Sequence, residues 1–526
     1  MPRLPHGKGI ALEEARDAGN ALASSARNLT LGLPAARPGY TQDFGFLFPE
    51  LQEDPDNLLP ERRQTREALV ELGRTMLDTR APGGEDPSIP AAYTYFGQFV
   101  DHDITFETAS ATLPDLIRPD LIPLPLDQIE DEIHNARTAT LELDSIYGVP
   151  APRTGARMGI GQVTALNGGS KPYLRPPGKG DANDLPREGR SSDAEHDRAA
   201  LIGDPRNDEN LIIAQLHLAF LLAHNTLVER GATFGEARRR LCRHYQHIVL
   251  HDFLKRIADP QIVDDIIENG NRIFHLDDEK FFMPLEFSVA AYRFGHSMLG
   301  ADYDFNLNFN TSGEAGTDSA TLGHLFTLTA LSGELGDFDT LPDNWIIEWE
   351  NFVDVGAPFN RVRRIDTKLV EPLFELPDLQ GRPQPEDHAR LAVLDLLRGY
   401  LLRIPTGQAV ARVLQQRLQE VRDIPVLSAN QVRNGAASHE QVQVLEDAGF
   451  LQRTPLWYYI LAEAAVLQDG QRLGPVGSTI VAEVLVGLVS HSEHSILRAE
   501  NWEPNLPRER PDTFTLIDLL RFAGVL

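Results

Sequence analysis

The sequence predicts a mostly α-helical protein, and three observations support this prediction. Apolar residues recur at steps of three and four along much of the chain, which is the period of an α-helix. Strand-like alternation is scarce, and no internal repeat is visible. The composition, 42% hydrophobic and 24% charged residues, is that of a folded globular chain. The length of 526 residues alone would suggest two or three domains.

Charge and cysteine content exclude several classes of protein. The 77 acidic residues outnumber the 49 lysines and arginines, which gives a formal net charge of −28. Such a surface repels nucleic acids and anionic lipids, so we expect no nucleic-acid partner. The single cysteine, Cys242, excludes an intrachain disulfide.

The first 40 residues predict an arm rather than a packed element. They are interrupted by proline and glycine and show little periodicity, so we expect an N-terminal arm (1–40) on a body formed by residues 41–526. Residues 1–30 also lack the apolar run of a secretory leader, and no uninterrupted apolar stretch approaches the roughly 18 residues of a membrane span. We therefore expect a location in the cytoplasm, or secretion without a conventional signal peptide.

A helix near residues 90–106 concentrates polar side chains on a segment that otherwise favours burial. Pro90 suits a first helical turn. The apolar stripe consists of residues three or four apart: Tyr93, Phe96, Val100 and Ile104. Gln98 and His102 share a face, and Asp101 and Asp103 flank His102 on either side. Taken alone, this pattern is more typical of a solvated helix end with one hydrogen-bonded histidine.

Oxygen-bearing side chains occupy every second position from 138 to 144: Thr138, Thr140, Glu142 and Asp144. Alternate residues of an extended loop point to one side, so these groups could converge on a hard cation. The alternative is a strand with a solvated polar face. Without a further acid from elsewhere in the chain, the strand is favoured.

Further helical periodicity covers residues 62–77, 205–227, 234–256, 288–299 and 387–413, and residues 454–526 alternate helices and turns. Asp204 suits the N-cap of the second of these helices. Arg206 and Glu209, three apart, project from one side of its first turn, either as an exposed ion pair or with Arg206 near a reacting anion. Arg293 and His296 share a face of the helix at 288–299, where a lone histidine is usually a core residue.

Four of these segments, in this order along the chain, resemble motifs of the animal-type haem peroxidases of the peroxidase–cyclooxygenase superfamily, in a bacterial form. They are the distal motif Gly97–Asp103, the calcium loop Thr138–Tyr147, the catalytic-arginine motif Gly203–Asn210 and the proximal motif Tyr292–His296. The resemblance covers residues 40–526. It implies one multi-helical catalytic unit with little β structure and with haem between two helices, in place of several domains.

The resemblance also implies catalytic roles. His102 would be the distal base, a neutral imidazole of ordinary pKa that moves a proton between the peroxide oxygens. Arg206 would stabilise the negative charge that develops on peroxide. Gln98 would order water or a small anion in the distal pocket, and His296 would be the iron ligand.

Other positions are implied to bind haem. The family's proximal partner is an asparagine, whose place is taken here by Asp395, and a carboxylate there would favour ferric iron. Arg293 and Arg398 would pair with the haem propionates. Asp101 and Glu209 match carboxylates that form ester bonds to haem in the mammalian enzymes, so we expect haem b with one or two esters. The methionine of the mammalian sulfonium link is replaced by Asn210.

The resemblance supplies the further acid for the cation loop. Asp103 would complete a calcium site with Thr138, Glu142, Asp144 and a carbonyl of Thr140, which reverses the preference for a strand. Because Asp103 follows His102 directly, the ion would fix the orientation of the distal histidine.

The implied function is a haem peroxidase active in the response to oxidative stress. It would use H2O2, through a ferryl porphyrin-radical intermediate, to oxidise phenols, aromatic amines, iodide, thiocyanate and, as a further candidate, bromide. The alternative is a haem-dependent fatty-acid dioxygenase, which carries a radical-forming tyrosine three residues before the proximal histidine. Arg293 holds that position here, and Tyr292 is displaced by one. A third class, a haem-binding or structural relative without activity, would need only His296.

Overall fold

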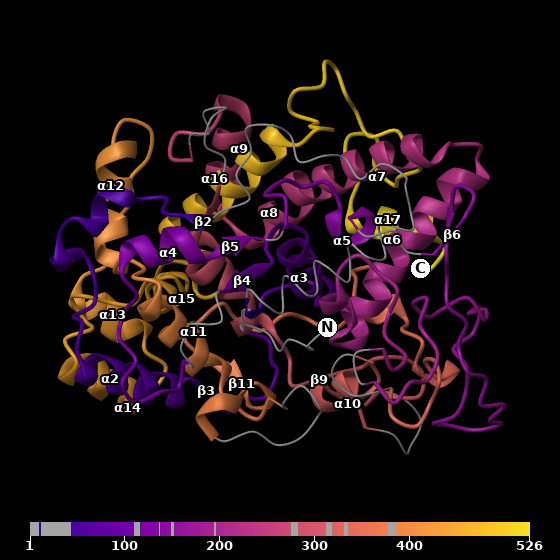
Figure 1. The fold of residues 1–526 in the computed structure, drawn as a ribbon, viewed down its shortest axis with the longest axis horizontal. Coiled ribbons are helices and arrows are strands. Elements are labelled where there is room, and N and C mark those ends of the chain that lie inside the picture. The colour runs from indigo at the N-terminus through magenta and orange to yellow at the C-terminus, as the bar shows by residue number, and fades with distance from the viewer. Residues whose placement is uncertain are drawn as a thin grey trace.

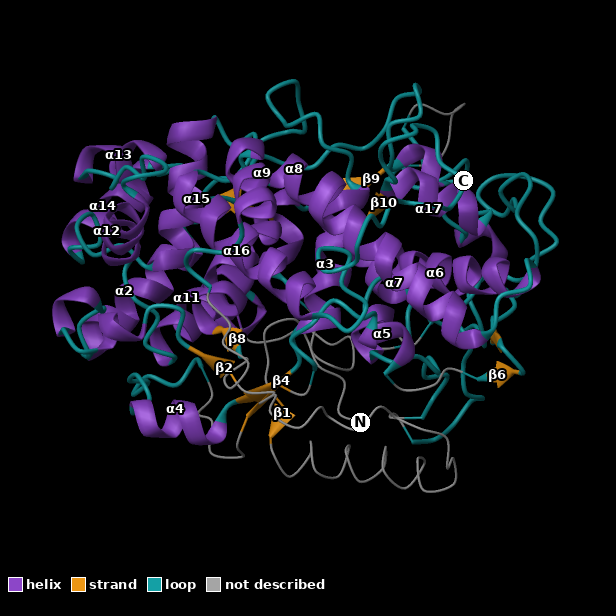
Figure 2. Cartoon of the chain, turned by 90° about the horizontal axis from the view of Figure 1, so that it is seen from above, coloured by secondary structure: helices purple, strands orange, loops and turns teal. Residues whose placement is uncertain are grey.

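The computed structural model describes residues 10–11, 44–109, 116–135, 137–148, 152–193, 196–274, 282–311, 318–330, 335–376 and 386–526. Within these residues helices dominate and strands are short, which confirms the predicted fold class (Figure 2). The N-terminal arm expected at 1–40 lies outside the described residues, apart from Ile10 and Ala11. The buried apolar residues between Phe44 and Val525 form one continuous cluster.

The α-helices are α2 (Arg63–Arg74), α3 (Ala92–Ile104), α4 (Leu126–Glu132), α5 (Asp144–Tyr147), α6 (Leu211–Glu229), α7 (Phe234–Ile248), α8 (Leu254–Ile257), α9 (Pro260–Asn269), α10 (Leu322–Thr327), α11 (Leu391–Leu401), α12 (Gly407–Leu418), α13 (Ala429–Gly435), α14 (His439–Asp447), α15 (Leu456–Gln468), α16 (Pro475–His491) and α17 (Leu516–Ala523). Two π-helical turns, η4 (Val249–Phe253) and η5 (Glu286–Ala290), follow α7 and precede the proximal segment. The 3-10 helices are η1 (Pro49–Gln52), η2 (Pro55–Asn57), η3 (Pro205–Asp208), η6 (Ala291–Met298), η7 (Asp343–Trp345), η8 (Trp349–Asn351), η9 (Glu371–Phe374) and η10 (Glu386–Ala389).

Strands pair in small sheets of two or three. They are β1 (Ile10–Ala11), β2 (Phe44–Gly45), β3 (Leu77–Asp78), β4 (Glu107–Ala109), β5 (His134–Asn135), β6 (Arg153–Thr154), β7 (Arg157–Met158), β8 (Met283–Pro284), β9 (Asp302–Tyr303), β10 (Ala320–Thr321) and β11 (Leu369–Val370). The three-stranded sheet has the order β1-β4-β5, parallel between β1 and β4 and antiparallel between β4 and β5. β4 follows α3 closely, so this sheet continues directly from the central helix.

Helix α3 lies near the centre of the molecule. In two perpendicular views, α12, α13 and α14 lie at one end of the long axis and α6, α7 and α17 at the other, with α3 between them (Figures 1 and 2). All four residues of its predicted apolar stripe are fully buried. Phe99, outside that stripe, stacks on Phe220 of α6 with centroids 4.5 Å apart, and Tyr245 of α7 meets Phe96 and Phe99 edge-on. The polar residues of α3 are thereby carried into the interior.

Helix α6 is the one described helix that is long and apolar enough to cross a membrane. The sequence prediction looked for an uninterrupted apolar stretch and found none of that length. In α6 the polar residues, among them His217 and His224, interrupt the stretch, but the average over the helix stays apolar. However, 83% of the qualifying window is buried inside the protein, as in any core helix. The helix is therefore weak evidence of a membrane span.

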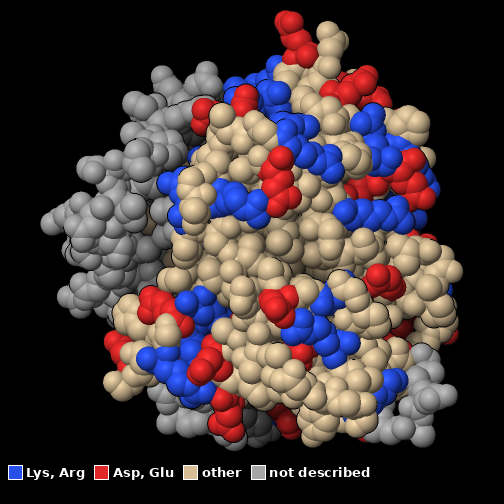
Figure 3. Space-filling model, turned by 90° about the vertical axis from the view of Figure 1, so that its right-hand side faces the viewer, with Lys and Arg blue, Asp and Glu red and all other residues tan. Residues whose placement is uncertain are grey.

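Surface charge is mixed in sign on the end of the molecule that carries α6 and α7. Acidic and basic side chains form small adjoining clusters around an uncharged area on this face (Figure 3). The excess of acidic residues therefore does not create a field of one sign there, and such mixed surfaces favour solubility over tight binding of a polyion.

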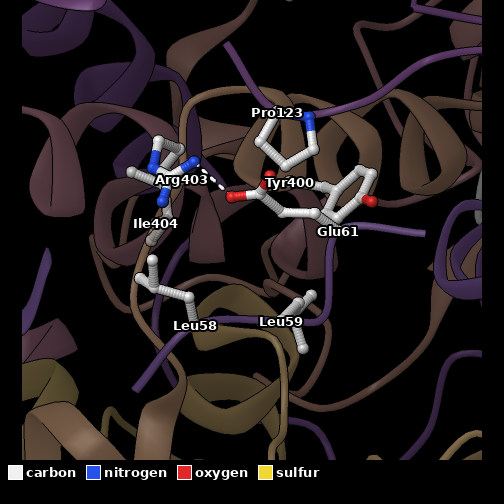
Figure 4. A pocket seen from close by; sticks show the side chains of 7 residues that line it. All are labelled: Leu58, Leu59, Glu61, Pro123, Tyr400, Arg403 and Ile404. Atoms are coloured by element: carbon white, nitrogen blue, oxygen red, sulfur yellow. Dashed lines mark hydrogen bonds and ion pairs between the residues drawn. The ribbon is translucent and has the colours of Figure 1, made fainter. Parts of the chain in front are cut away.

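Helix α11 is anchored at its C-terminal end. Ile404 donates to the carbonyl of Gly399 at 2.9 Å, and Arg403 takes a left-handed backbone with φ of 54°. The Arg403 side chain pairs with Glu61 beside a recess of about 10 Å³, room for about one water, which is also lined by Leu58, Leu59, Pro123, Tyr400 and Ile404 (Figure 4). This contact links the residues that follow α11, the helix of Asp395 and Arg398, to the segment of Glu61.

Candidate active site

His102 lies near the C-terminal end of α3 and is fully buried (0% exposed). Its Nδ1 lies 2.8 Å from Oδ1 of Asn207. Because an amide oxygen only accepts hydrogen bonds, Nδ1 carries the proton and Nε2 carries the lone pair. Burial, followed by the charge of Arg206, lowers the pKa of His102 to about 4. The imidazole is neutral near pH 7 as expected, but its pKa is not ordinary, because the ring is excluded from water.

Arg206 is held against the same turn of α3. One of its terminal nitrogens donates to the main-chain oxygens of His102 at 3.1 Å and Thr105 at 2.6 Å, and its guanidinium also bonds Asp204 at 2.7 and 3.1 Å. Burial alone would raise the pKa of Asp204, but Arg206 and Arg137 outweigh it and hold that pKa well below its usual range. The candidate base and the candidate cation are thus fixed at one place through the backbone of α3.

The segment around Arg206 differs from the predicted helix. Asp204 caps the 3-10 helix η3 by accepting from the main-chain N–H of Arg206 at 2.9 Å. The long helix α6 begins only at Leu211, where Oδ1 of Asn210 accepts from the N–H of Ile213 at 3.0 Å. The prediction that Asp204 caps the long helix is therefore wrong, and Arg206 and Glu209 belong to the turn before it.

Gln98 and Glu209 meet beside His102. Nε2 of Gln98 donates to Oε1 of Glu209, and Oε1 of Gln98 accepts from Nδ2 of Asn210 at 3.2 Å. The same Glu209 oxygen lies 3.9 Å from Nε2 of His102. Burial raises the pKa of Glu209 to about 8, against the opposing charge of Arg206. Three predicted residues from two distant segments are thereby brought together.

Asp101 connects α3 to the proximal helix η6. Its Oδ1 accepts from Oγ1 of Thr105 at 2.9 Å, and its Oδ2 lies 3.5 Å from a terminal nitrogen of Arg293. Burial would raise the pKa of Asp101, but the nearby charges, with Arg293 foremost, hold it below its usual value. The ion pair places the segment of Arg293 and His296 directly against the helix of His102.

His296 is buried and is oriented by Asp395. Its Nδ1 lies 2.6 Å from Oδ2 of Asp395 on α11, a pair that sequence comparison with the family motif predicted as neighbours. The carboxylate accepts the Nδ1–H, which leaves Nε2 as the ring nitrogen that can bind a metal. A histidine fixed in this way is suited to bind a metal through Nε2.

The proximal segment is a 3-10 helix rather than an α-helix. In a 3-10 helix residues three apart eclipse each other, so Arg293 lies directly in line with His296. Tyr292 is four residues from His296 and is rotated by about a third of a turn, whereas in an α-helix it would nearly share the face of His296. Its ring stacks on Phe287 with centroids 4.7 Å apart, and its hydroxyl is buried with no hydrogen-bond partner in the part of the chain that the structure describes.

The proximal residues fit a haem group. Gly295 precedes His296 and Gly399 follows Arg398, and a Cβ added at either glycine would meet no atom within 4 Å. The direction in which each glycine would carry a side chain is therefore open. Burial lowers the pKa of Arg398 to about 10, which marks an interior cation suited to an anionic group such as a propionate. An imidazole such as that of His296 is a ligand that haem iron takes in peroxidases.

The expected calcium donors do not form one shell as they stand. Each carboxylate oxygen of Asp103 accepts a main-chain N–H, from Leu143 at 3.2 Å and from Ser145 at 3.1 Å. Oε1 of Glu142 accepts from the N–H of His494 at 2.8 Å, and its Oε2 is buried with no hydrogen-bond partner among the described residues. No group of three carboxylate, imidazole or thiol side chains is gathered for a metal within the described ranges.

Thr138 and Thr140 take different places around this loop. The hydroxyl of Thr138 donates to Oδ2 of Asp144, while Thr140 donates its N–H to the carbonyl of Thr138 at 2.7 Å. Burial, followed by the charge of Asp144, raises the pKa of Asp103 to about 8. The structure brings Asp103, Thr138 and Asp144 together but turns Glu142 toward His494. Calcium binding stays a prediction.

Part of this chain is similar in sequence to haem peroxidases. A family model described as "Animal haem peroxidase" matches residues 125–327. A "Peroxidase-like protein" from Margaritifera margaritifera is 32% identical over 123 residues, and the match covers 19% of this chain and 14% of the length of that relative. His102 lies outside the family match, so its assignment rests on the geometry described above.

Solved structures with the same fold include peroxidases and dioxygenases. Peroxidase A from Dictyostelium discoideum has a TM-score of 0.55 at 15% identity, covering 86% of this chain and 88% of that one. Fatty acid alpha-dioxygenase from Oryza sativa has a TM-score of 0.52 at 13% identity, covering 82% and 74%. The Arabidopsis thaliana enzyme has a TM-score of 0.53 at 12% identity, covering 84% and 71%. The predicted resemblance to the animal-type haem peroxidases is therefore confirmed over residues 125–327, and the solved structures show the same fold.

Proposed function

We propose that this protein is a haem peroxidase that uses H2O2 to oxidise small electron donors such as phenols, aromatic amines, iodide, thiocyanate and bromide. The observation that carries this proposal is the joint fixation of His102 and Arg206 on one turn of α3. A protein that only binds haem needs His296 and has no use for a buried base with a cation held beside it. Bound haem supplies the iron that takes two oxidising equivalents from H2O2 and passes them to donors one at a time.

The protein's own residues move the proton and stabilise charge. Nε2 of His102 carries the lone pair, so it accepts a proton from one oxygen of H2O2 and returns it to the other oxygen as the O–O bond breaks. Arg206 keeps a positive charge beside the base, where it would stabilise the negative charge that develops on peroxide. Gln98, bonded to Glu209 and Asn210, orders water beside the base.

The second candidate is a fatty-acid dioxygenase, because two structural neighbours bear that name. The geometry of η6 favours the peroxidase. The position in line with His296 is occupied by Arg293, which cannot form a tyrosyl radical, and Tyr292 is rotated onto another face beside Phe287. An arginine at position 293 can also pair with an acidic group, either Asp101 or a haem propionate.

An absorption spectrum of the haem-loaded protein before and after one equivalent of H2O2 tests the proposal. We expect a ferric Soret band that shifts within a second and returns to its ferric position on addition of iodide or a phenol. Bound haem without a prompt response, together with oxygen uptake on addition of a fatty acid, would assign the protein to the dioxygenases. A chain that binds no haem would contradict both functions.

Replacing Asp395 with asparagine is expected to raise the reduction potential of the bound haem. The carboxylate lies 2.6 Å from Nδ1 of His296 and makes the imidazole a stronger donor, which favours ferric iron; a neutral amide removes that effect. Spectroelectrochemical titration measures the potential. Asp366→Asn, which removes a carboxylate paired with Arg80 instead, is the matched control. An unchanged potential in the Asp395 variant would remove this carboxylate from the tuning of the iron.

We further propose that haem becomes linked to Asp101, Glu209 or both by ester bonds and forms no sulfonium link. Asn210 stands where a methionine would be required, and its side chain is already engaged as the N-cap of α6. After turnover with H2O2, acidified organic solvent is expected to leave haem on the protein, and the double variant Asp101→Asn, Glu209→Gln is expected to release all of it. Complete extraction from the unaltered protein would rule out the esters.

Calcium binding by residues 138–144 is a separate prediction. A bound cation would offset the repulsion between Asp103 and Asp144 and would require Glu142 to leave His494. Elemental analysis of the purified protein is expected to find one calcium per chain, and its removal with a chelator is expected to lower haem retention. A haem-loaded protein that contains no calcium, or that loses calcium with no change in haem content, would contradict the prediction.

A further inference from the structure

Asn207 lies between two buried histidines. Its Oδ1 is 2.8 Å from Nδ1 of His102 on α3, and its Nδ2 is 2.9 Å from Nδ1 of His217 on α6. All three side chains are fully buried (0% exposed). Asn207 itself belongs to the short 3-10 helix η3, so three separate elements meet at one amide.

The two ends of this amide impose opposite tautomers on the two rings. The oxygen accepts only, so His102 must carry its proton on Nδ1 and present a lone pair at Nε2. The NH2 group donates only, so His217 must present a lone pair at Nδ1. Burial lowers the pKa of His217 to about 3, which keeps this ring neutral and able to accept. If the amide turned over, both tautomers would reverse, and Nε2 of His102 would carry a proton instead of a lone pair.

His217 determines whether the observed orientation can persist. With His217 present, the NH2 group of Asn207 has an acceptor that is not His102. Without His217, the only observed partner that could accept from the NH2 group of Asn207 is Nδ1 of His102. The NH2 group reaches that nitrogen only if the amide is turned over. An unsatisfied buried N–H is rarer in folded proteins than an under-satisfied carbonyl, so loss of His217 favours the reversal.

We propose that Asn207 and His217 act together as positioning residues that hold His102 in the tautomer with its lone pair at Nε2. His217 would thus control the proton-accepting nitrogen of His102 through Asn207 alone. The kinetic half of this inference rests on the proposed peroxidase function, because only a reaction with peroxide uses that lone pair. The tautomeric half concerns the chain itself and stands without haem.

The decisive variant is His217→Leu, which keeps a similar volume and removes the acceptor. His224→Leu is the matched control: His224 is equally buried on the same helix but bonds Tyr147 and the carbonyl of Ala156. A second variant, His217→Asn, offers an amide oxygen near the former Nδ1 and serves as the conservative replacement. If His217→Leu does not fold, Asn207→Leu tests the same bridge from its centre.

The first readout is the tautomer of His102 in the haem-free full-length chain labelled with 15N-histidine, assigned by comparison with His102→Gln. We expect the proton on Nδ1 in the unaltered protein, in His224→Leu and in His217→Asn, and on Nε2 in His217→Leu. With Asn207→Leu we expect a mixture of both tautomers. A proton that stays wholly on Nδ1 in both His217→Leu and Asn207→Leu would overturn the proposal.

The second readout is the rate of reaction of the haem-loaded protein with H2O2, with the rate of cyanide binding measured in parallel. Both reactions deliver a proton to the base, so both are expected to slow by about tenfold or more in His217→Leu, with haem content unchanged. A tautomer that switches while both rates stay the same would refute positioning for catalysis and leave the peroxidase function intact. An unaltered protein that ignores H2O2 would refute that function, and the tautomer measurement would still decide the role of Asn207.

Discussion

Replacing His102 with leucine is expected to slow the reaction of the haem-loaded protein with H2O2 by about 10²- to 10⁴-fold, the range typical for loss of a general acid–base. The ring is fully buried, with Nε2 3.9 Å from Oε1 of Glu209, so bulk water does not replace it as the proton acceptor. Leucine fills a similar volume without an acceptor. Stopped-flow absorbance under pseudo-first-order conditions measures the rate constant.

The control for this variant is His244→Leu on α7. His244 is also fully buried, and its Nε2 accepts main-chain N–H groups of Asn505 and Leu506, so its loss tests the general cost of removing an interior histidine. We expect unchanged peroxide kinetics in this control. If His102→Leu reacts as fast as the unaltered protein, the proton transfer belongs to another group and the assignment of the base is wrong.

Replacing Arg206 with alanine is expected to slow the same reaction by about 10²- to 10³-fold, the effect of losing one preorganised donor at a developing negative charge. The variant also breaks the bonds of Arg206 to the main-chain oxygens of His102 and Thr105, so part of the loss comes from a less firmly held base. Arg206→Lys keeps the charge but loses the planar fork, and it is expected to recover only part of the rate.

Arg137→Gln separates the catalytic effect from the loss of a partner for Asp204. Arg137 is the other cation on this carboxylate, at 2.6 Å, but it makes no bond to the main chain of α3 in the described residues. We expect the Arg137 variant to react with H2O2 at nearly the unaltered rate while losing stability. Equal slowing in both variants would mean that Asp204 needs two cations for folding, and that Arg206 has no role of its own in catalysis.

The central helix could be predicted from the sequence because its signal is local. The apolar stripe of α3 has a period that matches burial against α6 and α7, and the four polar residues follow from their positions on that helix. The proximal segment was correctly expected to be helical, but its 3-10 geometry could not be inferred. Over eight residues the periods of 3.0 and 3.6 differ by less than one turn, and the preceding π-helical turn η5 has no marker in the residue types.

In the predicted calcium loop, residues 138–144, the alternation of side chains along the sequence predicts the wrong side-chain directions. Residues at every second position share a side only if the chain stays extended, and here Leu143 adopts a left-handed backbone with φ of 57° while α5 begins at Asp144. Glu142 and Asp144 therefore diverge, and neither an extended loop nor a strand describes residues 138–144. A non-glycine residue in that conformation is uncommon enough that the sequence gives no warning of it.

Asn207 was missed for a different reason. Its two partners lie 105 and 10 positions away and on different helices, so their meeting depends on tertiary packing that no local pattern records. The available signal was its place next to Arg206, where a buried amide would have to be satisfied on both sides. Asp395 was predicted because its position follows from a family motif, and no helical periodicity was needed to find it.

The crowding of α3 also limits which sequences can replace this one. Gln98, Asp101, His102 and Asp103 lie within six consecutive positions of a helix in which successive residues advance by about 100°. A single residue inserted or deleted between Gln98 and Asp101 would turn Gln98 by that angle relative to the other three. A substitution in this turn removes one side chain, whereas a change in its length displaces the side chains relative to one another. Relatives of this protein that keep the site are thus expected to keep the number of residues from 98 to 103.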